Sequence, residues 1–119
     1  MSVEHKAINK AITPKEARRR HFEEVVPDEV YEVINQLLVE KYSASIKVLQ
    51  EEVIDRAIKM MRLNEKTSVS EKDFFAEHWL DVEPVYEAHG WLVSFYKPEF
   101  DNGSFRPYWL FSVPSSMLS

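Results

Sequence analysis

Near residue 90 the apolar residues change from helical spacing to strict alternation, and this change constrains the fold more than any other feature. Residues 91–96 and 108–113 both alternate, so their successive side chains point to opposite faces of a strand. Between the two runs lies Asn102-Gly103, a pair typical of hairpin turns. The sequence therefore predicts a C-terminal aromatic β-hairpin.

Both faces of this hairpin are apolar, although a two-stranded sheet needs only one such face for its own core. The face expected to pack on helices holds Trp91, Val93, Phe95, Trp109, Phe111 and Val113. The outer face and the loop hold Leu92, Tyr96, Tyr108, Leu110, Phe100 and Phe105. A cover for the outer face is expected from the N-terminal helix, a second copy of the chain or a partner protein. These six outer residues are the candidate protein-binding residues, and base stacking on the two tyrosines is a further alternative.

Capping signals mark two helices in the first third of the chain. Thr13-Pro14 followed by Glu16 predicts a helix that runs to about Val25. Pro27 then opens a second helix, whose apolar stripe extends to Tyr42.

The middle of the chain predicts further helices and one ambiguous segment. Residues 46–48 fit either a short strand or a first helical turn, and residues 50–64 have the broad apolar face of a helix. A capping pattern predicts a short helix over residues 70–79. Asp81 is the expected cap of another short helix, which Gly90 should stop.

These elements predict a single α+β domain, in which a helical N-terminal two-thirds is closed by a C-terminal antiparallel β-hairpin. The domain spans residues 13–114, between a basic N-terminal arm at 1–12 and a C-terminal tail at 115–119 that should fray. The same order of elements is that of a winged-helix domain, in which the loop is the wing. A helical bundle with an appended hairpin explains the order equally well.

Composition excludes several classes of function. The chain has no cysteine, which rules out disulfides, thiolate catalysis and cysteine-ligated metal sites. Its two glycines leave no glycine-rich phosphate loop. No apolar run approaches the roughly 20 residues that span a bilayer, and none follows the N-terminus as a secretory signal requires. We therefore expect a cytoplasmic protein.

The search for catalytic and metal-binding patterns is negative. A metal shared by His78 and His89 would need further ligands such as Glu77, Asp81 or Glu83, and both histidines are equally explained by packing and by a helix C-terminus. Paired carboxylates for acid–base chemistry would come from a charge run that is typical of a solvated helix face. That run is Glu77, Asp81, Glu83 and Glu87. We predict no enzymatic activity, no cofactor and no metal.

The formal net charge of −5 conceals a basic N-terminal region. Residues 1–22 carry six basic and two acidic side chains, a charge of +4, which leaves −9 for the rest. The candidate nucleic-acid-binding residues are Lys15, Arg18, Arg19 and Arg20. A solvated helix face explains them too, and an acidic body repels nucleic acid and favours basic protein partners. The recognition helix of a winged helix would be residues 81–90, which contain no Lys or Arg.

Several segments resemble small proteins encoded by tailed bacteriophages, which share a W-L-D-V-E…Y…G-W core before an aromatic hairpin. The segments are Pro27–Leu38, His78–Glu83, Tyr86, Gly90–Val93 and Tyr96–Pro98. The resemblance covers about residues 27–113 and leaves out the basic arm. It implies a phage setting and carries over no site residue.

We therefore expect a non-enzymatic phage accessory protein that binds a protein partner or associates with itself. It would modulate a host or defence factor, or assist virion assembly, and would act in the host cytoplasm or the virion. The alternative is a nucleic-acid-binding, winged-helix-like protein that uses its basic N-terminal arm.

Overall fold

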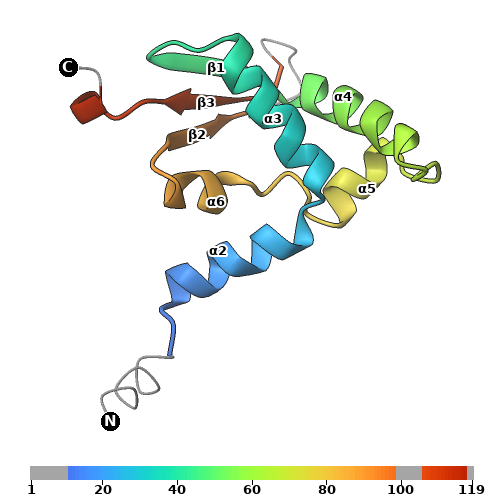
Figure 1. The fold of residues 1–119 in the computed structure, drawn as a ribbon, viewed down its shortest axis with the longest axis horizontal. Coiled ribbons are helices and arrows are strands. Elements are labelled where there is room, and N and C mark those ends of the chain that lie inside the picture. Colours follow the sequence, from blue (N-terminus) through green and yellow to red (C-terminus); the bar gives the residue numbers. More distant parts are fainter. Residues whose placement is uncertain (1–10, 99–105, 118–119) are drawn as a thin grey trace.

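The computed structural model describes residues 11–98 and 106–117, and every structural statement below concerns these residues. The predicted α+β class is confirmed, with helices in the N-terminal part and a three-stranded antiparallel sheet (Figure 1). The elements are α2 (Pro14–Val25), α3 (Asp28–Glu40), β1 (Ser45–Leu49), α4 (Gln50–Leu63), α5 (Glu71–Ala76), α6 (Glu83–Ala88), β2 (Leu92–Tyr96), β3 (Tyr108–Ser112) and a 3-10 turn (Ser115–Met117).

The sheet has the strand order β1-β3-β2, and β3 pairs antiparallel with both neighbours. The predicted pairing of β2 with β3 is confirmed, with Val93 opposite Phe111. The ambiguous segment at residues 46–48 is a strand, and Ile46 lies opposite Phe111 on the other side of β3. The sheet therefore has one strand more than the hairpin alone, drawn from the middle of the chain.

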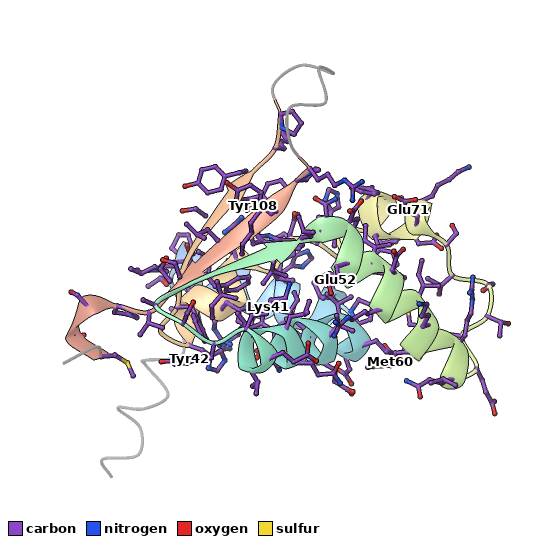
Figure 2. All side chains as sticks on the ribbon, turned by 90° about the horizontal axis from the view of Figure 1, so that it is seen from above. Lys41, Tyr42, Glu52, Met60, Glu71 and Tyr108 are labelled. Atoms are coloured by element: carbon purple, nitrogen blue, oxygen red, sulfur yellow. The ribbon has the colours of Figure 1, made fainter. Side chains whose placement is uncertain are left out.

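The helices pack against one face of this sheet. Helix α3 contacts β1 and α4, and α6 contacts β2. Figure 2 views the molecule from above, with the teal helix α3 on one side of the sheet. Trp109 and Phe111 of β3 are buried beneath the helices, and the Tyr86 ring of α6 meets the Phe111 ring edge to face at 5.3 Å. The predicted inner face therefore forms part of the core at Trp109 and Phe111, whereas Phe95, which was also expected to face the helices, is 37% exposed.

Local hydrogen bonds start α2 and α5 where the sequence predicts. Thr13 Oγ1 accepts a hydrogen bond from the Glu16 N–H at 3.0 Å, which caps α2. The Ser70 N–H donates to Asp73 Oδ2 at 2.8 Å at the start of α5. In each case the bond gives a partner to a backbone N–H at the start of the helix, where no helical carbonyl is available to accept it.

Three helices end in the same way, with a residue of positive φ followed by a hydrogen bond back across the last turn. The residues are Glu65 (φ 66°), His78 (φ 61°) and Gly90 (φ 98°). After Gly90, the Trp91 N–H donates to the Tyr86 carbonyl at 3.1 Å, as in a Schellman motif. The predicted stop at Gly90 is confirmed. The prediction of a helix over residues 70–79 is wrong at its end, because the left-handed His78 stops α5 at Ala76.

Two smaller predictions are also wrong. Tyr42 lies beyond the end of α3 and is 64% exposed, so it does not extend the apolar stripe of that helix. Asp81 does not cap α6, because Val82 occupies the cap position and the Asp81 carboxylate faces His78 Nδ1 at 3.4 Å. In the C-terminal tail, residues 115–117 form a 3-10 turn, with the Met117 N–H donating to the Pro114 carbonyl.

One buried carboxylate joins α3 to the end of α4. Glu29 is 3% exposed and accepts hydrogen bonds from Asn64 Nδ2 at 2.8 Å and Lys66 Nζ at 3.0 Å. Burial acts to raise the pKa of Glu29, but the hydrogen bonds from Asn64 and Lys66 outweigh it and hold the pKa below its ordinary value. The charged form of Glu29 therefore stabilises the fold at neutral pH.

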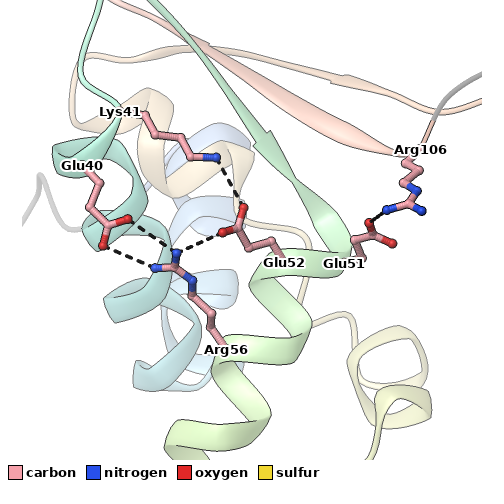
Figure 3. Close-up of polar contacts among 6 residues, drawn as sticks. All are labelled: Glu40, Lys41, Glu51, Glu52, Arg56 and Arg106. Atoms are coloured by element: carbon pink, nitrogen blue, oxygen red, sulfur yellow. Dashed lines mark hydrogen bonds and ion pairs between the residues drawn. The ribbon is translucent and has the colours of Figure 1, made fainter.

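Exposed ion pairs lie around the N-terminal turns of α4 (Figure 3). Arg56 lies between Glu40 of α3 and Glu52, which also pairs with Lys41 at 3.4 Å. A separate pair, between Glu51 and Arg106, joins α4 to the residues before β3. Since surface pairs of this kind contribute about 0–1 kcal/mol each, they orient these elements more than they stabilise them. The set is Glu40, Lys41, Glu51, Glu52, Arg56 and Arg106.

Candidate binding surface

The outer face of the sheet is the surface that the sequence marks as a contact site. The register places Leu92 opposite Ser112, Tyr96 opposite Tyr108, and Ser94 opposite Leu110. The four predicted strand residues therefore lie together on one face, because side chains on one face of paired strands are neighbours. Their cross-strand arrangement makes a continuous strip over β2 and β3.

Side-chain contacts order part of this strip. The Tyr96 and Tyr108 rings are stacked with their centroids 5.1 Å apart. Lys47 Nζ of β1 lies 4.5 Å from the centroid of the Tyr108 ring, a cation–π contact. Leu92 is 57% exposed and Tyr96 is 42% exposed, while Leu110 is half-buried. The face thus presents large apolar and aromatic groups to solvent.

The N-terminal helix, one of the three expected covers, packs elsewhere. Helix α2 contacts α6, on the helical side of the molecule (Figure 1). Its Phe22 and Val25 are half-buried there, and the Tyr31 hydroxyl donates to the Phe22 carbonyl at 2.9 Å. Among the described residues, therefore, no helix lies over the outer face.

The sequence missed the part of this face that β1 supplies. Lys47 and Leu49 belong to it, opposite Leu110 and Tyr108. A clear period-two pattern over residues 45–49 would have been the signal, but the run is short and leads directly into α4. Two of the predicted residues, Phe100 and Phe105, lie outside the described residues.

Two of the four predicted nucleic-acid-binding residues of α2 pair with neighbouring acids. Arg19 pairs with Glu16 and with Glu23 at 2.8 Å, and Arg20 pairs with Glu16 at 3.0 Å. Hydrogen bonds from Arg19, and then from Arg20, lower the pKa of Glu16 to about 2. These pairs cancel much of the local positive charge.

The other two basic candidates have different surroundings. The Arg18 guanidinium lies 5.4 Å from the centroid of the Phe22 ring, while Lys15 is exposed. Arg18 and Lys15 are therefore the cations that α2 leaves without a carboxylate partner among the described residues.

The histidine pair does not form a metal site in the described part of the chain. His78 faces Asp81, whereas His89 lies at the other end of α6, and no group of three or more metal-ligating residues is present there. The geometry that a tetrahedral site requires is therefore missing from these residues.

Glu83, one of the carboxylates considered for acid–base chemistry, is half-buried. Burial raises the pKa of Glu83, and the nearby Trp109 indole partly offsets this effect. The Trp109 N–H interacts with Glu83 electrostatically but has no acceptor in normal hydrogen-bonding geometry. Both groups line an open cavity of about 350 Å³ beside the exposed rings of Phe75 and Phe95. Asp81 and Lys97 also line this cavity.

The chain matches no family model, no curated protein and no solved structure. In the described part of the chain, no helix is both long and apolar enough to cross a membrane.

Proposed function

We propose that this chain is a non-enzymatic binding protein, and that a partner protein docks on the outer face of its sheet. The observation that carries this proposal is the exposed strip of Leu92 and Tyr96 beside Tyr108 and Leu110, with the helices packed on the opposite face. Exposed apolar patches on a small protein are typical of interaction sites, and tyrosines are enriched in them. Its resemblance to phage proteins supports an accessory role during infection.

The fold supports an interaction domain of the winged-helix type. We infer a winged-helix arrangement from the strand order β1-β3-β2 and from the position of α6 directly before β2, where α6 would serve as the recognition helix. The wing would be residues 99–105, which lie outside the described residues. Helix α6 carries Glu83 and Glu87 and no cation, so it would meet DNA phosphates with like charge. A winged helix with this surface is better suited to protein than to DNA.

The test compares two variants in which serine replaces an exposed apolar side chain. Leu92→Ser changes the outer face, while Val39→Ser changes an apolar side chain of α3 that is 78% exposed and lies away from that face. A protein captured from infected cells should be retained by the wild type and by Val39→Ser, and be lost with Leu92→Ser. The same ranking must then be reproduced with the purified partner.

Two results would overturn the proposal. Equal capture by all three proteins would place the partner elsewhere. Sedimentation of a wild-type dimer that Leu92→Ser dissociates would assign the face to a second copy of the chain. The nucleic-acid alternative predicts instead that binding to DNA falls steeply with salt and that Arg18, Arg19 and Arg20→Ala flattens this dependence.

A further inference from the structure

A second cavity lies on the helical side of the molecule, away from the outer face of the sheet. Its volume is about 440 Å³, and it opens between α2, α3, α6 and the residue that precedes β2. This size is within the range of ligand-binding pockets. Its walls are Glu23, Asp28, Tyr31, Asn35, Val85, Tyr86, His89 and Trp91. Three of these residues are aromatic and two are carboxylates.

Hydrogen bonds and ring contacts fix the aromatic walls. The Tyr86 hydroxyl donates to Asn35 Oδ1 at 2.7 Å, and the Tyr31 hydroxyl is bonded to the backbone of α2. The Tyr31 and Tyr86 rings lie 6.1 Å apart, and Trp91 packs edge to face on Phe111 at 6.0 Å. Because the hydroxyls are engaged with the protein, these side chains offer a ligand their rings more than their polar ends.

The two carboxylates give the cavity a negative potential. Burial, together with the charges of Glu23 and Asp28, raises the pKa of Tyr31 to about 12. Glu23 also pairs with Arg19, whereas no cation of the described residues pairs with Asp28. A positive group that entered the cavity would find an unneutralised carboxylate and three electron-rich rings.

We propose that this cavity binds the cationic side chain of an arginine or lysine from a basic protein segment. Rings of Tyr and Trp attract a cation through their faces, and a carboxylate at the rim adds a charge-assisted hydrogen bond. The net charge of −5 also attracts basic protein segments toward the molecule. The site uses none of the residues of the outer face, so it does not depend on the function proposed above.

The experiment titrates the full chain with N-acetyl-arginine amide and follows the Trp91 indole N–H by NMR. N-acetyl-lysine amide is the second cationic probe, and N-acetyl-glutamine amide is the neutral control of similar shape. The measurements are made at about pH 8, above the ordinary pKa of an imidazole. Both cations should shift the Trp91 resonance in a saturable manner, and the neutral amide should not.

Two variants locate the binding site. Asp28→Asn should weaken cation binding several-fold, up to about tenfold, because it removes the unpaired charge but keeps a side chain that suits the first turn of α3. Glu32→Gln is the matched control, since Glu32 is an exposed acid of the same helix that does not line the cavity. Tyr31→Leu should also weaken binding, with thermal melting used to check that the variant is folded.

Two outcomes would overturn the proposal. One is an equal response to the neutral amide, and the other is unchanged cation affinity in Asp28→Asn. Neither result would test the function proposed for the outer face. Leu92→Ser, a change on that face, should leave the arginine titration unchanged.

Discussion

Both faces of the sheet carry large apolar side chains, but these side chains lie in different environments. Phe111 and Leu110 are neighbours in β3, yet Phe111 is fully buried against Tyr86 and Trp91 while Leu110 remains half-buried on the outer face. The difference comes from the helices, because α3, α4 and α6 pack against the same side of the sheet. Apolar character alone therefore does not tell which face is core and which is contact surface.

The largest difference in stability between the two faces should appear when Phe111 and Leu110 are each replaced by alanine. Phe111→Ala should lower the free energy of unfolding by about 3–5 kcal/mol, because it leaves a cavity among packed side chains. Leu110→Ala should cost less than about 1.5 kcal/mol, because part of its side chain already contacts water. Urea denaturation of both variants measures the two values, and equal costs would mean that the outer face is covered.

The next comparison tests whether β1 is the third strand. Ile46 is buried opposite Phe111, so Ile46→Ala should cost about 2–5 kcal/mol. Lys47 points to the outer face, and Lys47→Ala should cost about 0.5–1 kcal/mol through the lost contact with the Tyr108 ring. The same denaturation assay applies. A large cost at Lys47 with a small one at Ile46 would contradict the register of the strand.

Glu83 lies at the edge of the core, and its replacement should have a smaller effect on stability that is of opposite sign: the variant should be more stable than the wild type. Burial raises the pKa of Glu83 above the ordinary value of 4.5, so the folded chain holds a proton there that the unfolded chain releases. The contribution of Glu83 to stability is therefore greatest below pH 4.5. This contribution is lost as the pH rises through the raised pKa of the folded chain.

Glu83→Gln removes this penalty while keeping an oxygen that can accept from the Trp109 N–H. The variant should melt at a higher temperature than the wild type at about pH 7 and at nearly the same temperature at about pH 4. Thermal melts at the two pH values provide the measurement. A variant that is destabilised at both would show that the charged carboxylate is favoured in the folded chain.

The smallest effect on stability is expected on the outer face. Leu92→Ser should change the free energy of unfolding by no more than about 0.5 kcal/mol, since most of the side chain is in water. Chemical denaturation should therefore detect almost no change in the variant that loses its partner. A cost of several kcal/mol would instead make Leu92 part of the core.

Much of the secondary structure could be predicted, because its signals are local. The caps at Thr13 and Ser70 and the stop at Gly90 each involve partners within five residues along the chain. The stop at His78 was missed because a left-handed histidine carries no clear sequence signal, unlike a glycine. The outer strip at residues 92–110 was predicted from alternation, whereas Lys47 and Leu49 were not.

By itself, the sequence determined the class of the fold, the ends of most helices and the two apolar faces of the hairpin. Tertiary structure decided that Ser45 lies across from Ser112, 67 residues away, and that the helices cover the face of Trp109 and Phe111. It also brought Asp28 and Trp91 to one cavity. The reason is physical: caps and alternation depend on neighbours along the chain, whereas burial and charge pairing depend on which distant segments pack together.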